Sequence, residues 1–320
     1  MKIDVHNHVI PRSVLDLLGR DSAFGATFPD GAMRCADAFE FPLVASFYDP
    51  RAKLDELSRH ELDGAVISIA PPAFFCDMDI ARGESLCALA NEGMAEFART
   101  SPDRFRWMAH VPMQEPDRAA SMLRSAVSRG AVGVEVATNI CGSRLDDPIF
   151  EPFWSVADEL GLLVMVHPYY NQPYLGLGNW YLQNVIGNPL ETMIVGCRLI
   201  CAGTLDRWPR ARVLLVHGGG HLPYQLGRLR HAASVRSELA GTAADPWSYA
   251  GRLKFDCLTH DADALAYLVG KAGIENVVIG TDLPFDMAPA LPVTMLRKAA
   301  GENGVRQIGE KNPLELFGIG

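Results

Sequence analysis

The chain lacks a surplus of basic residues, and it lacks long apolar runs. Its 320 residues include 29 lysines and arginines against 38 aspartates and glutamates, a formal net charge of −9. A nucleic-acid partner favours a basic face, so we expect none, although a local pocket for a small anionic substrate is compatible with this balance. No run of about eighteen apolar residues occurs, so we also expect no membrane span and no membrane partner.

The sequence also shows no cysteine pattern typical of disulfides and no N-terminal pattern typical of a leader. The seven cysteines are scattered and form no CxxC motif, which predicts reduced, buried thiols. The N-terminus does not have the layout of a signal peptide, because Asp4 and two histidines interrupt its only apolar stretch. Together these features predict a cytoplasmic protein.

Two sequence motifs of other enzyme folds are also absent. An open, doubly wound sheet usually carries GxGxxG after its first strand, and the chain has none there. Esterases that use HGGG as an oxyanion loop need a GxSxG nucleophile elbow, which is missing too. We therefore interpret the "HGGGH" segment at 217–221 differently: its glycines would let the backbone approach a bound substrate.

What the chain does contain is a series of eight short apolar runs, each bounded by turn residues. Such runs are typical of parallel strands that are buried on both faces. The eight runs are 2–8, 64–71, 104–112, 131–138, 162–168, 211–218, 252–259 and 276–282.

Helical patterns separate these runs. One pattern follows Pro50, a residue that favours helix starts, and residues 191–208 predict a single long apolar helix. Eight strands alternating with helices predict a (β/α)₈ TIM barrel, with residues 1–320 forming a single domain. Two long connections stand out, a 9–49 insertion after the first strand and a 169–188 loop after the fifth.

Five side chains suited to metal binding or acid–base chemistry stand at the ends of predicted strands: His6, His8, His167, His217 and Asp282. In a barrel of this type all carboxyl ends of the strands meet on one face. Buried imidazoles need polar partners, so this set is hard to assign to core packing. Histidines with one carboxylate suit a single divalent metal, most simply Zn²⁺, and such ligands accept Mn²⁺ as well.

Other polar residues near these ends have simpler interpretations. His221 is interpreted as a helix-start residue in preference to a polar group of the site. His260 follows the seventh strand on the same face, and a role outside the site is favoured for it. His110 is interpreted as a core histidine, and Glu135, in the fourth strand, is the less favoured alternative ligand.

At this point a family resemblance becomes visible over nearly the whole chain. The segments that carry it are "KIDVHNHVIP", "YDPRAKLDEL", "LLVMVHP", "VLLVHGGGHLPYQLGRLRH", "LTHDADAL" and "VVIGTDLPF". They resemble the decarboxylase-type branch of the amidohydrolase superfamily, the branch of 2-amino-3-carboxymuconate-6-semialdehyde decarboxylase. The resemblance implies one zinc held by His6, His8, His167 and Asp282, with His217 as the acid–base residue assisted by Asp282.

The resemblance also implies a homodimer, in which Arg228 would reach a substrate carboxylate in the neighbouring subunit. Two departures from the family pattern matter. The fourth strand has no lysine that could bridge a second metal, which favours a mononuclear site. Phe41 stands where the named decarboxylase has a substrate-binding arginine, so the exact substrate is left open.

The function implied is non-oxidative decarboxylation by a carboxy-lyase. Its substrate would be a small carboxylated aromatic or muconate-semialdehyde-type acid, in aromatic catabolism. The alternative is a hydrolase of the same superfamily acting on a lactone, an amide or a ring-cleavage product. Trp180 and Tyr181 suggest a planar substrate that stacks on aromatic rings, although they could serve a dimer interface equally well. A non-enzymatic metal-binding protein is disfavoured, because all five site residues are present.

Overall fold

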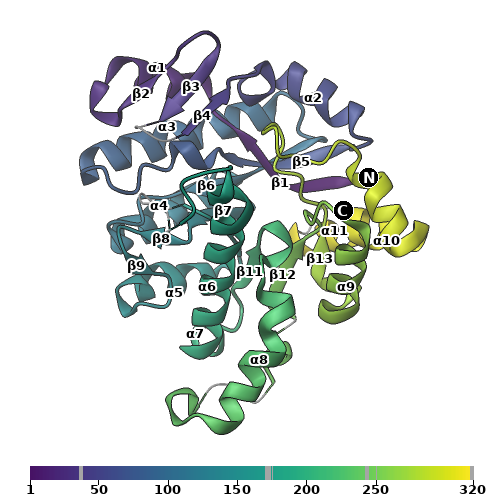
Figure 1. Ribbon diagram of the computed structural model, residues 1–320. Coiled ribbons are helices and arrows are strands. Elements are labelled where there is room, and N and C mark those ends of the chain that lie inside the picture. Colours follow the sequence, from purple (N-terminus) through teal and green to yellow (C-terminus); the bar gives the residue numbers. More distant parts are fainter. Residues whose placement is uncertain (36–38, 170–173, 175, 242–244, 250, 318–320) are drawn as a thin grey trace.

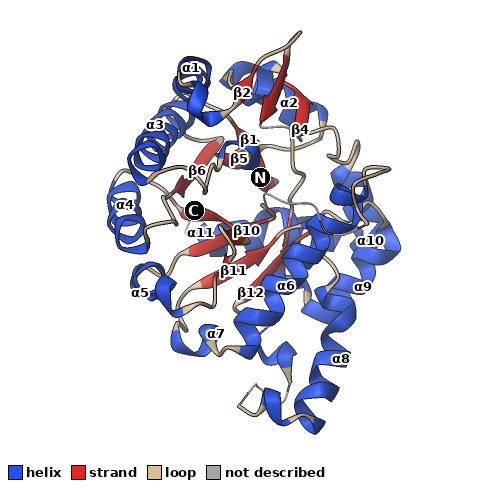
Figure 2. Cartoon of the chain, turned by 60° about the vertical axis from the view of Figure 1, so that its left-hand side comes forward, coloured by secondary structure: helices blue, strands red, loops and turns tan. Residues whose placement is uncertain are grey.

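The computed structural model describes the chain except for residues 36–38, 170–173, 175, 242–244, 250 and 318–320. Eight parallel strands form one sheet in the order β1-β5-β6-β7-β10-β11-β12-β13 (Figures 1 and 2). They are β1 Ile3–Val9, β5 Gly64–Ile69, β6 Phe105–His110, β7 Gly133–Ala137, β10 Leu163–His167, β11 Arg212–Leu215, β12 Leu253–Asp256 and β13 Val277–Val278.

The sheet closes on itself between its first and last strands. Val5 donates a backbone hydrogen bond of 2.8 Å to the carbonyl of Ile279, and His8 donates one of 2.8 Å to Leu283. Seven of the eight strands fall within their apolar runs, β1 extends one residue beyond its run to Val9, and the predicted (β/α)₈ barrel is confirmed. The prediction of one domain over residues 1–320 stays a prediction.

Helices surround the strands (Figure 2). They are α1 Arg12–Arg20, α2 Pro50–Arg59, α3 Ile80–Arg99, α4 Pro116–Ser128, α5 Glu151–Glu159, α6 Asn188–Cys201, α7 Thr204–Arg207, α8 Leu222–Val235, α9 Ala262–Ala272, α10 Pro292–Arg306 and α11 Asn312–Phe317. Helix α2 begins where Pro50 predicts, and Asp49 caps it by accepting from Arg51 N at 2.8 Å. No helix in the described part of the chain is long and apolar enough to cross a membrane.

The long helix predicted over 191–208 is in fact two helices. Helix α6 ends at Cys201, and α7 begins at Thr204. Between them Gly203 has a φ of 67°, a left-handed conformation that ends a helix and that glycine adopts without steric cost. Apolar character therefore predicted the helical residues correctly but did not predict the break.

The insertion after β1 contains more structure than the sequence predicts. It holds α1 and a small antiparallel sheet of β2 Ala26–Thr27, β3 Ala32–Cys35 and β4 Phe39–Pro42. A second small hairpin, β8 Asn139–Ile140 with β9 Ser143–Arg144, follows β7. These strands are too short to give a clear apolar alternation, which is why only connections were expected there.

The core has two parts. Apolar side chains from the barrel strands, among them Val5, Met108, Met165 and Leu214, pack together at zero or near-zero exposure inside the barrel, where Leu316 of α11 joins them. A larger cluster fills the space between the strands and the outer helices. The inner cluster fills part of the barrel, which leaves the carboxyl ends of the strands for polar side chains.

Candidate metal centre and active site

The first strand is shaped so that both of its histidines face inward. In the pairing of β1 with β5, Asp4 lies opposite Ala65 and Asn7 lies opposite Ile67, so β1 has one extra residue between these pairs. After such a bulge, the residues that would have pointed to one side of the sheet point to the other side. Ile3 and Val5 therefore pack in the inner core, and His6 and His8 point inward as well.

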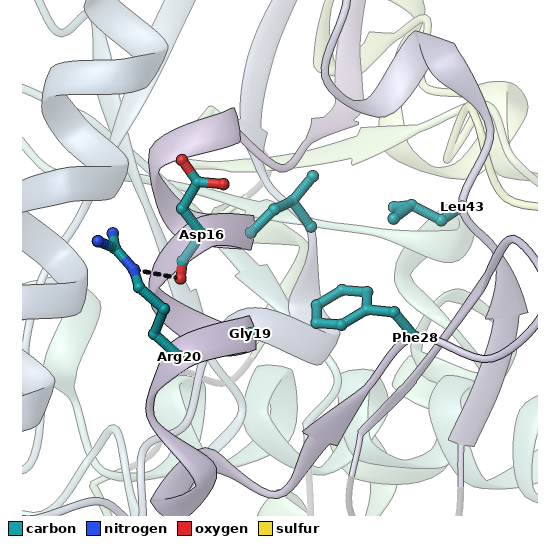
Figure 3. Close-up of a pocket in the computed structure, with 6 residues that line it drawn as sticks. Asp16, Gly19, Arg20, Phe28 and Leu43 are labelled. Carbon is teal, nitrogen blue, oxygen red and sulfur yellow. Dashed lines mark hydrogen bonds between the residues drawn. The ribbon is translucent and has the colours of Figure 1, made fainter.

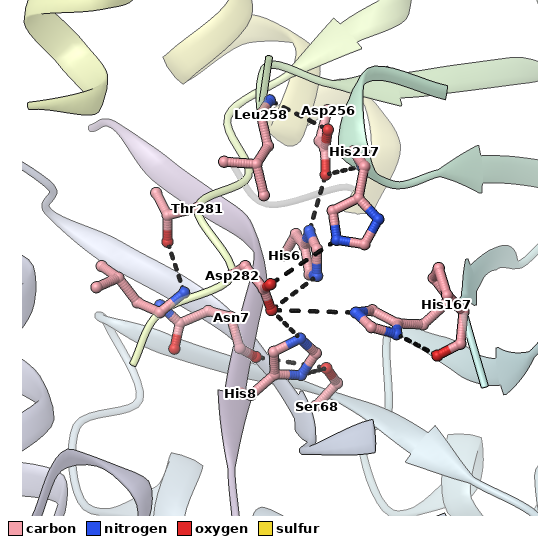
Figure 4. Close-up of polar contacts among 12 residues, drawn as sticks. His6, Asn7, His8, Ser68, His167, His217, Asp256, Leu258, Thr281 and Asp282 are labelled. Atoms are coloured by element: carbon pink, nitrogen blue, oxygen red, sulfur yellow. Dashed lines mark hydrogen bonds and ion pairs between the residues drawn. The ribbon is translucent and has the colours of Figure 1, made fainter. Parts of the chain in front are cut away.

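Four predicted ligands meet at this end of the barrel (Figure 4). His6 and His8 come from β1, His167 ends β10, and Asp282 follows β13; all four are buried. Their ligand atoms lie within 4.8 Å of one another. The Nε2 atoms of His6, His8 and His167 lie 3.5, 3.1 and 4.0 Å from Asp282 Oδ1. The predicted convergence of these four residues is confirmed.

The free atoms of this cluster fit a cation. Asp282 Oδ1 and the three Nε2 atoms are buried, and none of them has a hydrogen-bond partner. Leaving one buried polar atom unpaired costs about 1–3 kcal/mol, so four at one point imply a missing partner. Three imidazoles and one carboxylate form a donor set that zinc and manganese both accept, and the residues present therefore fit a divalent metal.

Each ligand histidine is oriented through its other nitrogen. Nδ1 of His6 donates to Asp256 Oδ2 at 2.8 Å, and Nδ1 of His167 donates to the Pro168 carbonyl at 3.0 Å. Nδ1 of His8 lies 3.2 Å from Ser68 Oγ, whose hydroxyl donates to the carbonyl of Asn7 at 3.4 Å. Protons on the Nδ1 atoms leave the Nε2 lone pairs directed at the cluster centre, as metal binding requires.

Asp256, at the end of β12, is a site residue that the sequence analysis missed. Besides His6, its carboxylate accepts from the backbone N–H groups of His217 at 2.9 Å and Gly218 at 2.6 Å. Burial alone would raise the pKa of Asp256, but its hydrogen bond from His6 and the nearby positive charge lower it below the usual value. A signal was present, since Asp256 is the acid within an otherwise apolar strand end, "KFDCLT".

The two histidines of β1 have opposite electrostatic environments. Burial lowers the pKa of His8 to about 4, so its imidazole is neutral at neutral pH. Burial also opposes protonation of His6, yet the hydrogen bond to Asp256 and the charge of Asp282 raise its pKa to about 9. A metal bound at Nε2 would therefore displace a proton from His6.

His217 stands beside the cluster and is not enclosed by it. Its Nε2 lies 3.8 Å from Asp282 Oδ2, and its side chain is partly exposed. Its φ of 57° turns the chain sharply after β11. The glycines that follow allow close packing rather than substrate approach alone, because a Cβ on Gly220 would lie 2.0 Å from the carbonyl oxygen of Pro189.

A cavity of about 560 Å³ opens next to His217 and Asp282. Its lining is mostly apolar, and its imidazoles are those of His217, His221 and His260. His221 precedes α8, as a helix-start residue should, and it lines this cavity as well. The remaining lining residues come from the segments around α6, α8, α9 and the loop after β13, and include Val185, Pro189, Pro223, Leu258, Leu268 and Met287.

The predicted substrate-binding residues lie outside the lining of this cavity. Trp180 is 84% exposed and Tyr181 is 49% exposed, both on the loop before α6. Arg228 is exposed on α8. Their predicted roles are not tested by a single chain and stay predictions.

Glu135 and Phe41 lie next to the metal ligands without belonging to the ligand cluster. Glu135 on β7 is buried, and its Oε1 lies 3.8 Å from Nδ1 of His8, the nitrogen that faces away from the cluster centre. Burial raises the pKa of Glu135 well above its usual value, which favours the neutral acid over a charged ligand. Phe41 packs edge-on against Phe47 and Phe285, and the ring of Phe285 contacts that of His8. These aromatic rings thus form an apolar wall beside the metal ligands, at the position where the decarboxylase that the sequence resembles has an arginine.

A second pocket lies beside α1 (Figure 3). It is lined by Leu15, Asp16, Gly19, Arg20, Phe28 and Leu43. None of the predicted site residues is among them. Arg20 Nε donates to the carbonyl of Asp16 at 2.9 Å, so this polar pair is already bonded within the helix.

Comparison with known proteins gives the family. The family model described as amidohydrolase matches residues 3–319. The chain belongs to the amidohydrolase family, and the predicted family is confirmed.

Two decarboxylases are among the relatives of this amidohydrolase. The 2-amino-3-carboxymuconate-6-semialdehyde decarboxylase of Dictyostelium discoideum is 28% identical over 100% of this chain and 92% of its own length. The gamma-resorcylate decarboxylase of Polaromonas sp. is 30% identical over 84% of this chain and 86% of its own.

A solved structure supports the fold. The 5-carboxyvanillate decarboxylase of Novosphingobium aromaticivorans, in complex with manganese and 4-hydroxy-3-methoxy-5-nitrobenzoic acid, superposes with a TM-score of 0.80. The match covers 100% of this amidohydrolase and 96% of that chain, at 20% identity. At this identity the likeness establishes the shared barrel.

Proposed function

We propose that this amidohydrolase is a metal-dependent, non-oxidative decarboxylase, a carboxy-lyase. Its substrate would be a small carboxylated aromatic or muconate-semialdehyde-type acid. The observation that carries the proposal is the group of four buried ligand atoms without hydrogen-bond partners, beside the partly exposed imidazole of His217 at the edge of a cavity. The decarboxylases among its relatives support the same reaction class.

The chain's own residues supply the proton chemistry. A bound divalent metal would act as a Lewis acid that stabilises negative charge on a substrate oxygen. As the carbon–carboxylate bond breaks, carbon dioxide leaves and the electron pair stays on the substrate carbon. His217 would deliver a proton to that carbon, and Asp282, 3.8 Å from its Nε2, would orient the imidazole.

The metal would be Zn²⁺, with Mn²⁺ as the second candidate. His6, His8, His167 and Asp282 would be its ligands, and the lack of a lysine on β7 favours one ion over two. The three imidazoles make the set softer than an all-oxygen site, which favours zinc, but nitrogen and oxygen ligands bind manganese as well.

A homodimer is proposed as the working assembly, with Arg228 reaching the partner's substrate and Trp180 and Tyr181 at the substrate or at the interface. Helix α8, which carries Arg228, extends away from the barrel in Figures 1 and 2. Exposed apolar side chains lie on this helix and in the segment before α6, notably Tyr224 at 77% and Val185 at 53%. Such a patch suits burial against a second copy. We also propose a cytoplasmic location, from the scattered unpaired cysteines.

The first test is carbon dioxide release. Zinc- or manganese-loaded protein is offered a panel of hydroxybenzoic acids, pyridine carboxylic acids and carboxymuconate semialdehydes. We expect one class to be decarboxylated, and His217→Ala to lower kcat about 10²–10⁴-fold while metal stays bound. His231→Ala, which alters an exposed histidine on α8, is the matched control and should keep full activity.

Two other outcomes would change the assignment. Loss of the metal in His217→Ala, in equal measure with activity, would make His217 a ligand. Turnover of lactones, amides or ring-cleavage products without carbon dioxide release would replace the decarboxylase by the hydrolase alternative, which the same residues can support.

A further inference from the structure

His260 shares a backbone feature with the residues of the proposed active site. Among the described residues, His217, His260 and Asp282 all have a positive φ, of 57°, 58° and 63°. For a residue with a side chain this left-handed conformation costs on the order of 1–2 kcal/mol, and such residues cluster at functional sites. These three follow β11, β12 and β13, three neighbouring strands of the barrel.

The three side chains also share one space. His217, His260 and Asp282 line the same cavity, whose walls are mostly apolar. His260 is close enough to His217 and Asp282 for their charges to act on its pKa. Its side chain is exposed where it lines this cavity, and its imidazole makes no hydrogen bond to another described residue. A residue with a positive φ that lines the cavity beside His217 and Asp282 is in a position to contact a ligand bound there.

We propose that His260 is a substrate-positioning residue, whose imidazole donates a hydrogen bond to a carboxylate or phenolic oxygen of the acid bound beside His217. This inference rests on the proposed function. Burial, together with the charge of His217, lowers the pKa of His260 below its usual value. The ring is therefore neutral at neutral pH and offers one N–H donor. Leu258, Val185 and Met287 would flank the apolar body of the substrate.

The test uses His260→Gly, because glycine adopts a positive φ without strain. The metal-loaded protein is titrated with 4-hydroxy-3-methoxy-5-nitrobenzoic acid in a calorimeter, and its melting temperature and metal affinity are measured in parallel. We expect His260→Gly to bind this acid roughly 10–100-fold more weakly, the loss of one hydrogen bond to a charged group. Metal affinity should be unchanged, and the melting temperature should be unchanged or higher.

Two variants complete the design. His260→Asn keeps an amide donor at a position where asparagine tolerates positive φ, so it should recover part of the affinity. Glu61→Gly is the matched control, because Glu61 has a φ of 59° on the exposed turn after α2, away from the cavity. It should alter stability in the same direction without changing acid binding.

The outcomes distinguish a failure of the proposed role of His260 from a failure of the proposed decarboxylase function. Wild-type affinity in His260→Gly, or a lower melting temperature with unchanged affinity, would overturn the role of His260 and leave the decarboxylase intact. No binding of the acid by the metal-loaded wild-type protein, together with no carbon dioxide release, would overturn both. With an active substrate, the expected signature in His260→Gly is a larger rise in KM than fall in kcat.

Discussion

At the scale of single residues, Asp256 organises more of the site than its position in an apolar strand end suggests. It fixes the ring of His6 through Nδ1, and it fixes the turn after β11 through the N–H groups of His217 and Gly218. A metal ligand and the proposed proton donor thus share one carboxylate. Partners of this type govern how firmly a ligand holds its metal.

Asp256→Asn should therefore weaken metal binding. The amide keeps the shape of the side chain but removes the negative charge that supports His6, so we expect the metal Kd to rise about 10–100-fold. Competition against a chromophoric chelator measures it. Asp146→Asn removes a carboxylate from a surface pair with Arg198 and should leave the Kd unchanged. Equal metal affinity in the two variants would refute the role of Asp256.

The ligands could be predicted from sequence, whereas the supporting roles of Asp256 and Ser68 could not, although Asp256 itself stands out as an acid at a strand end. His6, His8, His167 and Asp282 stand at strand ends, where barrel geometry alone brings them together. Ser68 and Asp256 act through hydrogen bonds to ring nitrogens, and these depend on side-chain directions that no spacing in the sequence encodes. Spacing identifies which groups meet, and three-dimensional packing decides what supports them.

At the scale of elements, the turn after β11 is held by close approach to α6. A Cβ on Gly220 would lie 2.0 Å from the carbonyl oxygen of Pro189, and φ at Gly220 is 60°. Both the space and the backbone conformation therefore exclude a larger residue. Only the glycines themselves were visible in the sequence, and the prediction that they let the backbone approach a bound substrate stays a prediction.

Gly220→Ala should destabilise the protein by about 1–3 kcal/mol, because strain and overpacking act together. Gly227→Ala is the control, since Gly227 lies within α8 with nothing within 4 Å of its would-be Cβ. Alanine there should instead stabilise the protein by up to about 1 kcal/mol. Chemical unfolding of both variants gives the comparison, and shifts of the same sign would contradict this account of the turn.

The bulge in β1 shows a limit of pattern-based prediction at this scale. A strict alternation that placed Ile3 and Val5 in the core would direct His6 and His8 outward. One extra residue in β1 relative to β5 turns both histidines inward, and nothing in "KIDVHNH" indicates this bulge. The strand was predictable from its apolar run, but its register was not, because register depends on pairing with β5.

At the scale of the whole molecule, the ligand cluster connects strands that are far apart in the chain. His6 and Asp282 lie on β1 and just after β13, where the barrel closes, and His167 comes from β10 on another part of the sheet. A bound ion would thus link the seam where the barrel closes to strand β10. It would also satisfy the four unpaired atoms at its centre.

Removal of the metal should therefore lower stability globally. At free metal equal to a hundredfold Kd, binding to the folded state adds about 2.7 kcal/mol to the free energy of unfolding. We expect chelation to lower the melting temperature and zinc or manganese to restore it, as differential scanning calorimetry would show. His167→Ala should melt at the same temperature with and without the metal. A metal effect of wild-type size in that variant would place the bound ion elsewhere.

The distribution of the ligands along the chain has a consequence for synthesis. His6 and His8 are translated long before Asp282, with His167 between them. Strand β1 also donates its closing hydrogen bonds, from Val5 and His8, to the carbonyls of Ile279 and Leu283. A nascent chain therefore holds an incomplete ligand set until Asp282 has been translated, so the four-ligand site can form only after the chain has reached that residue.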